Sequence, residues 1–439
     1  MPTPYPESGS QSHQTFQPVC RWARSLVHRP QVSGCVIDRT RLTRAVMLGL
    51  VRMLFCSTAA TGHFSPLVPV ARSCAEAGHE VRVAAPASFE SHVRRAGLDH
   101  APFEDIPAEV AGPIWASLPT LTMEEANRRV VREIFAGHAA RHAIPGLRAT
   151  IDEWRPDLVV REPAELGSLV AAEGANVPHV EVLAGLAEVT ALLMAELDEP
   201  LAALDAEAGM AEGTLYQAAT TSPCCTSVPA SLDGTTGHTG RPVWRYRADS
   251  GRPTGSLPEA WGDPDHPLVY ATFGTVAGAF DTFTHVFGGT LEALAGEPIR
   301  VLLTTGHSLD PESLRPWPPN AHVRQWWPQE QVMPLASAMV GHGGFGTTMA
   351  ALQAGVPQVI VPLFAFDQWV NARRVQGIGA GRMLEGGPAA TSELPAAVAE
   401  VTRDPAFRQR AETIAADFTA LPDVATLVPL LTDHARSAA

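Results

Sequence analysis

Residues 341–371 constrain the fold more than any other part of this chain. An apolar run at 335–340 leads into the sequence Gly-His-Gly-Gly-Phe-Gly-Thr-Thr, and an Ala/Leu/Met-rich stretch follows at 347–354. This order predicts a strand, a tight loop and a helix. A glycine and a proline then end the helix, and residues 358–362 predict the next strand. The unit is therefore β-loop-α-β, which is typical of parallel α/β sheets.

The glycine-rich loop at the start of this helix is suited to hold an anion. Glycines let the backbone approach a ligand closely, and the free N–H groups of the first helical turn carry the positive end of the helix dipole. The candidate donors are His342, Gly343, Gly344, Gly346, Thr347 and Thr348. Their imidazole, backbone and hydroxyl groups suit a diphosphate, and a purely structural turn is the alternative.

Composition sets the class of the protein. A chain of 439 residues with 45% hydrophobic content can bury more than one core, and its length favours two or three domains. The net charge of −14 argues against nucleic acid or an anionic membrane as a partner. No run of about 18 apolar residues predicts a transmembrane helix. Six cysteines without a Cys-x-x-Cys pair indicate a reducing cytoplasm rather than a disulfide framework.

The chain divides by composition into five segments. We expect a foreign N-terminal extension at 1–50, one α/β domain at 51–235, a linker at 236–266, a second α/β domain at 267–425 and a tail at 426–439. The extension is rich in Arg, Ser, Gln and Pro and lacks the apolar core of a secretory signal. It is therefore expected to be disordered, or to reflect a start placed too early, with Val51 or Met53 as the true one.

Apolar runs separated by helical patterns predict a parallel sheet in each half. Strands are expected at 53–57, 80–85, 157–160 and 179–182, and then at 268–273, 299–304, 322–325, 339–340 and 358–361. Parallel strands joined by helices give a doubly wound sheet, so the fold class is α/β with two Rossmann-like domains facing each other across a cleft. Helical stretches at 123–137 and 186–210 hold more apolar residues than one buried stripe needs. Packing is the favoured explanation, and lining a cleft for an apolar ligand is the alternative.

His63 is the candidate general base. It lies in the strand-to-helix loop of the first unit, at the carboxyl edge where open α/β sheets bind ligands. A neutral imidazole there could take a proton from a hydroxyl if a carboxylate fixed its tautomer. Glu162 follows another strand of the same sheet and could supply that carboxylate. The alternative is that one of 16 histidines occupies this loop by chance.

The sequence Gln-Trp-Trp-Pro-Gln before the glycine-rich loop offers a base-binding surface. Trp326 presents a flat ring for stacking, and Gln329 presents an amide for hydrogen bonding. We expect one of Trp326 and Trp327 to be a core residue instead.

Taken in order, these motifs resemble the donor site of inverting nucleotide-sugar glycosyltransferases of the GT-B fold. The pattern is Trp326-x-Pro-Gln329, His342-Gly-Gly-x-Gly-Thr, Gly355-Val-Pro and Asp367-Gln368-x-x-Asn371. Residues 55–66 and 156–162 are similar to the matching acceptor domain, so the resemblance covers about 51–425. It is strongest to actinobacterial enzymes that attach deoxysugars to polyketide, macrolide or enediyne aglycones.

The resemblance implies a mechanism and a donor. His63, backed by Glu162, would activate a hydroxyl of an apolar acceptor for inverting attack on the sugar. In the family the Trp326 position stacks on the base, Asp367 and Gln368 read sugar hydroxyls, and Thr275 could approach the phosphates. Plant relatives that use UDP-sugars have a ribose-binding Glu where this chain has Ala350, which favours a TDP-deoxysugar as co-substrate.

No metal or other cofactor is expected. Asp263-Pro264-Asp265 resembles the two-carboxylate metal motif of other transferases, but it lies in a proline-rich linker, where a solvated turn is favoured. The rival functions are a sugar-nucleotide epimerase, a nicotinamide oxidoreductase, which the loop at His63 disfavours because it lacks Gly-x-Gly-x-x-Gly, and a non-catalytic sugar-nucleotide-binding subunit. The sugar, the aglycone, a homodimer and an auxiliary activator protein are left open.

Overall fold

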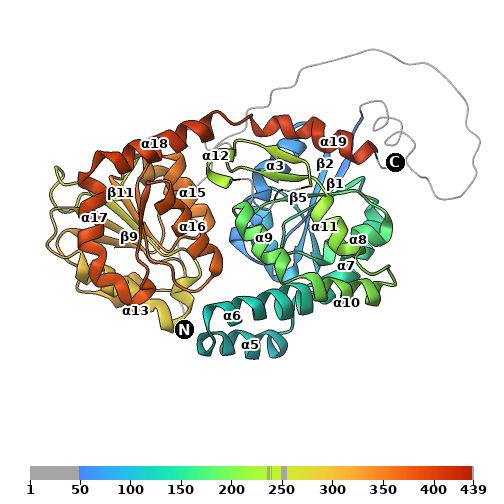
Figure 1. Cartoon of the computed structure of the whole chain (residues 1–439), viewed down its shortest axis with the longest axis horizontal. Coiled ribbons are helices and arrows are strands. Elements are labelled where there is room, and N and C mark those ends of the chain that lie inside the picture. The colour runs from blue at the N-terminus through green and yellow to red at the C-terminus, as the bar shows by residue number, and fades with distance from the viewer. Residues whose placement is uncertain (1–48, 235–237, 239, 249–254, 438–439) are drawn as a thin grey trace, which may run out of the picture. The chain divides into compact units, whose positions relative to one another are not determined.

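Two parallel sheets organise the protein (Figure 1). The computed structural model describes residues 49–234, 238, 240–248 and 255–437. The prediction for residues 1–50 falls outside the described residues except at its last two positions. Residues 49–439 form one compact unit, which contains both sheets.

The first sheet has seven strands in the order β3-β2-β1-β4-β5-β6-β7, each parallel to its neighbours. Its strands are β1 (Arg52–Cys56), β2 (Glu80–Pro86), β3 (Asp99–Phe103), β4 (Leu158–Arg161), β5 (His179–Val182), β6 (Cys224–Thr226) and β7 (Val243–Arg245). The helices of this half are α2 (Thr61–Phe64), α3 (Leu67–Glu76), α4 (Glu90–Arg95), α5 (Ala108–Ser117), α6 (Met123–Arg129), α7 (Ala140–Trp154), α8 (Gly167–Ala175), α9 (Ala187–Ala195), α10 (Asp198–Ala208), α11 (Thr214–Thr221) and α12 (Ala230–Asp233).

The second sheet has six parallel strands in the order β10-β9-β8-β11-β12-β13. They are β8 (Leu268–Thr272), β9 (Arg300–Thr304), β10 (Ala321–Arg324), β11 (Ala338–Gly341), β12 (Gln358–Ile360) and β13 (Gly381–Met383). The helices that follow are α13 (Asp281–Ala293), α14 (Gln329–Val332), α15 (Phe345–Gln353), α16 (Phe366–Gly377), α17 (Leu394–Arg403), α18 (Pro405–Thr419) and α19 (Leu427–Ser437). Central strands such as β8 are buried throughout, which explains their unbroken apolar sequence.

Strand order fixes where ligands bind. In each sheet the chain winds outward in one direction and then in the other, so the crossovers leave a crevice at the carboxyl ends of the two strands where the direction changes. These strands are β1 and β4 in the first sheet and β8 and β11 in the second. The two Rossmann-like sheets predicted from the sequence are confirmed, and both predicted sites follow strands of this kind.

The structure differs from the predicted layout in two places. Part of the predicted linker, 236–266, forms β7, which pairs with β6 at the edge of the first sheet. The predicted tail, 426–439, contains α19, whose residues Leu427 and Leu431 are buried in the core of the first half. β7 is short, and α19 lies far along the chain from the core that it joins. Local sequence patterns therefore do not predict where either element packs.

Candidate active site

His63 and Glu162 form a hydrogen-bonded pair at the crevice of the first sheet. His63 lies on α2, directly after β1, and Glu162 directly follows β4. The His63 Nδ1 atom lies 2.8 Å from Glu162 Oε2. Glu162 is fully buried, whereas the His63 side chain is 32% exposed. The carboxylate also accepts the backbone N–H groups of Thr58 at 3.1 Å and Ala164 at 2.7 Å, which hold it in place.

The pair fixes the proton of the imidazole. Burial alone would raise the pKa of Glu162, but His63 and the two backbone N–H donors outweigh it and lower the pKa. Because an ionised carboxylate only accepts hydrogen bonds, His63 must carry its proton on Nδ1. The neutral ring then leaves the Nε2 lone pair free to accept a proton. Burial lowers the pKa of His63, yet Glu162 more than offsets this, so the pKa lies above its usual value of 6.5.

We expect kcat/KM to rise with pH through the raised pKa of His63, because only the neutral imidazole can accept a proton. The pair's contribution to stability runs the opposite way. The stabilisation from His63 is complete below pH 6.5 and is lost as pH rises through the raised pKa. A pH profile of kcat/KM, recorded beside thermal unfolding, checks this. An activity that falls steadily from pH 6 to pH 8 would contradict it.

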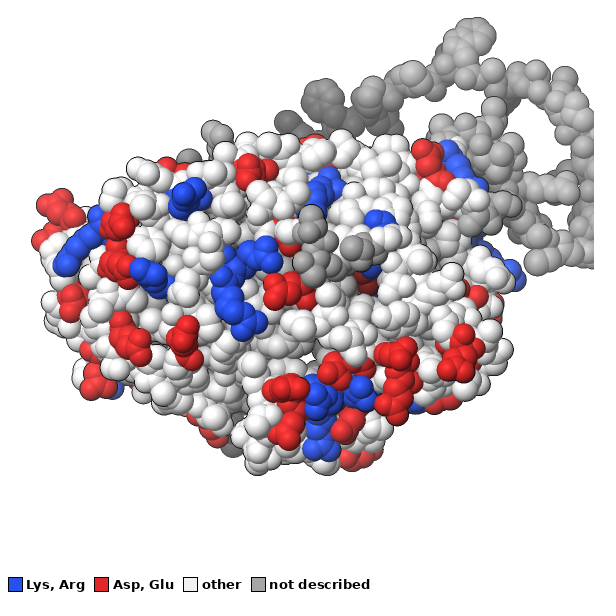
Figure 2. Space-filling model, viewed as in Figure 1, with Lys and Arg blue, Asp and Glu red and all other residues white. Residues whose placement is uncertain are grey.

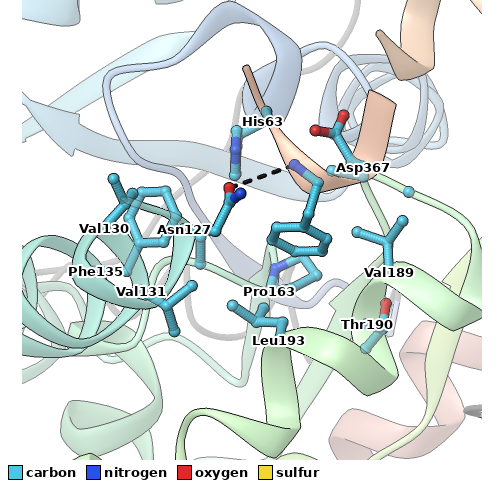
Figure 3. Close-up of a pocket in the computed structure, with 15 residues that line it drawn as sticks. His63, Asn127, Val130, Val131, Phe135, Pro163, Val189, Thr190, Leu193 and Asp367 are labelled. Atoms are coloured by element: carbon cyan, nitrogen blue, oxygen red, sulfur yellow. Dashed lines mark hydrogen bonds between the residues drawn. The ribbon is translucent and has the colours of Figure 1, made fainter. Parts of the chain in front are cut away.

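A pocket of about 200 Å³ opens beside His63 (Figure 3). Its lining is mainly apolar and comes from both halves of the chain: His63, Asn127, Val130, Val131, Phe135, Pro163, Ala164, Ala184, Gly185, Val189, Thr190, Leu193, Ala365, Phe366 and Asp367. The Phe135 ring packs against His63 with 5.7 Å between ring centroids. The pocket can therefore hold an apolar group against the imidazole.

One wall of the pocket is a π-helical segment, Val130–Ala139, which continues α6. The wider π turn places Val130, Val131 and Phe135 together on the pocket side. Such segments are rare and are often found at functional sites. The opposite wall comes from α9. The apolar stretches at 123–137 and 186–210 thus line a pocket as well as packing in the core.

The second half places His342 between two glycine loops. His342 follows β11, and its ring lies against Gly274, in the loop after β8, and against Gly344. Gly274 has φ +78, and a Cβ there would stand 2.8 Å from His342 Cε1, so glycine is required on both counts. Burial lowers the pKa of His342 to about 4, with the Thr272 backbone opposing it weakly. The ring is therefore neutral at pH 7 and keeps one N–H donor.

The predicted anion socket corresponds to the N-terminus of α15. Gly344 is its N-cap residue, and no side chain caps the first turn. The backbone N–H groups at the start of α15 are therefore free for a ligand. Gly343 has φ +86, and a Cβ there would lie 2.7 Å from the Gln368 carbonyl oxygen. Gly346 is exposed and Thr347 half-buried. Thr348 is fully buried, and its hydroxyl has no hydrogen-bond partner among the described residues.

The two tryptophans separate as expected. The Trp326 ring is 56% exposed after β10, free to stack on a flat ligand. The indole N–H of Trp327 donates to the Ser256 carbonyl, and its ring packs on a buried cluster. Gln329 Nε2 donates to Thr347 Oγ1 at 3.0 Å, which leaves the Gln329 carbonyl oxygen as the end that can accept from a ligand.

Asp367 and Gln368 lie in the first turn of α16 but differ in position. Asp367 lines the pocket across from His63 (Figure 3). Burial raises the pKa of Asp367 to about 6, opposed by His63. Gln368 is buried, and its carbonyl oxygen accepts from Leu363 N and Phe364 N, so it supports the loop. Only its NH₂ group is available to a ligand.

The remaining candidates lie apart from the pocket. Thr275 is exposed in the loop beside His342. Asp263 and Asp265 are exposed, and Asp263 Oδ1 accepts from Asp265 N at 3.0 Å, as in a solvated turn. No described helix is long and apolar enough to cross a bilayer. Within the described ranges the cysteines are free and buried: Cys56, Cys74, Cys224 and Cys225.

Sequence reasoning missed Asn127 and Phe366, which line the pocket and bond to each other. Neither stands in a recognisable motif. Their only signal was the apolar excess of the stretch after Asn127, which does not say which residues face a ligand.

Comparison with known proteins identifies the family. Residues 73–237 match the N-terminal domain, and residues 294–433 the C-terminal domain, of the family described as "Erythromycin biosynthesis protein CIII-like". The L-demethylnoviosyl transferase of Streptomyces niveus is 31% identical over 393 residues, which is 88% of this chain and 99% of that protein. The elloramycin glycosyltransferase of Streptomyces olivaceus is 30% identical over 85% of this chain and 94% of that protein.

The fold is that of the GT-B glycosyltransferases. The crystal structure of the glycosyltransferase VinC in complex with dTDP has a TM-score of 0.69 at 24% identity, covering 88% of this chain and all of that one. The family match spans both halves, and each half contributes residues to the one pocket beside His63. The chain therefore belongs to the erythromycin biosynthesis protein CIII-like family and is a glycosyltransferase of the GT-B fold.

Proposed function

We propose that this protein transfers a deoxysugar from a TDP-sugar to a hydroxyl of an apolar natural-product aglycone, with inversion and without a metal. The observation that carries the proposal is the His63–Glu162 pair, whose free Nε2 faces a pocket shared by both halves. Close relatives in sequence include a demethylnoviosyl transferase and a TDP-daunosamine transferase. A dTDP complex of a protein with the same fold supports the choice of nucleotide.

The chemistry follows from the arrangement of the groups. His63 Nε2 takes the proton of the acceptor hydroxyl while that oxygen forms a bond to the anomeric carbon. The bond from this carbon to the diphosphate oxygen breaks on the opposite face, and the diphosphate leaves with the electron pair. Free N–H groups at the start of α15 and the neutral ring of His342 stabilise the charge on the leaving group. Glu162 stabilises the imidazolium until its proton passes to solvent.

The pocket defines the kind of acceptor. Its volume of about 200 Å³ is below the roughly 300–1,000 Å³ of pockets that enclose a drug-sized ligand. It therefore receives the part of a larger aglycone that carries the reacting hydroxyl. An apolar lining favours a ring with few polar groups apart from that hydroxyl. A sugar-nucleotide epimerase has no use for such a pocket.

The donor is expected to be a TDP-sugar, because Ala350 on α15 offers no carboxylate to a ribose 2′-hydroxyl. In competition, TDP-sugars should give a higher kcat/KM than UDP-glucose. In the Ala350→Glu variant the ratio of kcat/KM for TDP-sugars to kcat/KM for UDP-glucose should fall by about tenfold. This is the effect expected from one charge-assisted hydrogen bond between the new carboxylate and the ribose 2′-hydroxyl. Products formed from a TDP-sugar panel and hydroxylated polyketide acceptors are read by mass spectrometry.

Two outcomes of this experiment count against the proposal. UDP-glucose could give a higher kcat/KM than every TDP-sugar, which would contradict the donor. Conversion of the donor to an epimer without any acceptor would instead indicate an epimerase.

A further inference from the structure

We propose that Asn127 is a positioning residue that caps helix α16 from the other half of the protein, and so holds Asp367 in place opposite His63. This inference rests on the proposed function, because its effect is on sugar transfer. Asn127 belongs to α6 in the first half, and α16 belongs to the second. The Asn127 Oδ1 atom accepts the Phe366 backbone N–H at 3.3 Å (Figure 3).

The orientation of the Asn127 amide is set by a second bond. Its Nδ2 donates to the Met123 carbonyl oxygen at 2.7 Å, one turn earlier in α6. With the NH₂ group held there, the carbonyl oxygen must face Phe366. The side chain is half-buried, so the bond is partly shielded from water.

Helix α16 lacks a cap of its own. Its N-cap residue is Ala365, which has no side-chain acceptor, and of its first-turn N–H groups Gln368 N bonds to the Ala365 carbonyl oxygen. Phe366 is the first residue of the helix, whereas a side chain at the N-cap accepts from the second or third helical residue. The acceptor for the Phe366 N–H must therefore come from outside the helix. Here it comes from a residue 239 positions away.

The capped turn is the one that faces the general base. Asp367 follows Phe366 directly and lines the same pocket as His63 and Asn127. The next residue, Gln368, holds the preceding loop through Leu363 N and Phe364 N. Movement of this turn would therefore shift the Asp367 carboxylate in the pocket. It would also loosen the loop at residues 363–365, which leads into α16.

Helix α6 is a firm support for the bond. Thr122 and Glu125 form a capping box at its start, with each side chain bonded to the backbone of the other residue. Arg128 bridges Glu124 on the same helix and Glu196 after α9. Acidic and basic side chains lie close together in places on the face that Figure 2 shows, among a mostly uncharged surface. Asn127 is thus fixed relative to both walls of the pocket.

The proposal predicts that removing the Asn127 amide lowers activity only when the Phe366 N–H is present to bond to it. Asn127→Ala should lower kcat/KM for the donor about three- to tenfold, the value of one partly buried hydrogen bond. It should also raise the share of donor that is hydrolysed rather than transferred. Asn127→Asp should restore most of the activity at the plateau of the pH profile, because a carboxylate accepts well at a helix N-terminus.

A double-mutant cycle isolates the hydrogen bond. Phe366→Pro removes the N–H at the first helical position, where proline is favoured, and Ala365 already has the extended conformation (φ −106, ψ 138) that precedes proline. Phe366→Ala is the matched control, since it loses the same ring but keeps the N–H. Asn127→Ala should lower kcat/KM about three- to tenfold in the Phe366→Ala background. It should leave kcat/KM unchanged in the Phe366→Pro background, where the N–H is absent.

Equal losses in both backgrounds, or no loss in the otherwise unchanged protein, would overturn the proposal. Arg94→Ala, a change on the exposed surface of α4 that does not line the pocket, should leave kcat/KM within about twofold. Hydrogen exchange at residues 363–371 gives a readout without turnover, and protection there should fall in Asn127→Ala and recover in Asn127→Asp. If the unchanged protein transfers no sugar, the proposed function fails, and hydrogen exchange still decides whether Asn127 caps the helix.

Discussion

Replacing His63 with alanine is expected to lower kcat for sugar transfer by about 10²- to 10⁴-fold, the usual contribution of a general base. The hydroxyl of the acceptor would then lose the imidazole lone pair that Glu162 keeps free for a proton. Donor binding should change little, because the socket at α15 lies in the other half. Single-turnover transfer from a TDP-sugar measures the chemical step directly.

The protein should remain folded in this variant. Glu162 keeps its bonds from Thr58 N and Ala164 N, so the buried carboxylate is not left without partners. His285→Ala is a suitable control, because His285 is exposed on α13. A His63→Ala protein that retains more than about a tenth of kcat would locate the base elsewhere, or would support a non-catalytic binding role for this side chain.

In the Glu162→Gln variant kcat is expected to fall by about 10²-fold or more while the protein stays folded. A glutamine can present its NH₂ group to His63 Nδ1, which favours the tautomer with the proton on Nε2 and removes the lone pair from the pocket. Because Glu162 is the main group that raises the pKa of His63, whatever activity remains should appear at lower pH. The pH profile separates this effect from simple loss of structure.

A matched control lies three residues further along the chain. Glu165 is also buried, but its carboxylate accepts from Gly167 N and Ser168 N at the start of α8 rather than from a histidine. Burial raises the pKa of Glu165 to about 7, so the site tolerates a neutral group, and the single oxygen of a glutamine can still accept from one of the two N–H groups. Glu165→Gln should keep kcat within about threefold. Equal losses of kcat in Glu162→Gln and Glu165→Gln would mean that replacing any buried carboxylate in this region disturbs the fold.

The parallel core was predictable because its strands are buried on both faces. Runs such as Leu268–Thr272 and Leu158–Arg161 are apolar almost throughout, and each of the nine expected strands is present. Four strands were missed. Three of them, β3, β7 and β13, lie at sheet edges, and β6 lies next to β7. The strands β6, β7 and β13 have only three residues each, and β3, Asp99–Phe103, carries charge and proline. Such strands depend on a neighbour for their hydrogen bonds, so their own sequence says little.

Site residues that follow strand ends were also predictable. Glu162 and His342 each come directly after a central strand, and His63 lies in α2, the next element after the central strand β1. A parallel sheet brings such positions to one edge. The pairing of His63 with Glu162 followed from that rule, although the 2.8 Å distance did not. The motif did not predict burial, because Gly346 is exposed whereas Thr348, two residues later in the same motif, is fully buried.

The sequence by itself determined the fold class, the uncapped helix start proposed to bind an anion, and the two residues proposed for proton transfer, because each depends on local order along the chain. Only the tertiary structure decided what meets at the reacting centre. Asn127 and Phe366 are 239 positions apart and come together because two separately wound sheets share one pocket. No local pattern encodes such a contact. It arises from how helices of one half pack beside those of the other, which is a property of the whole folded chain.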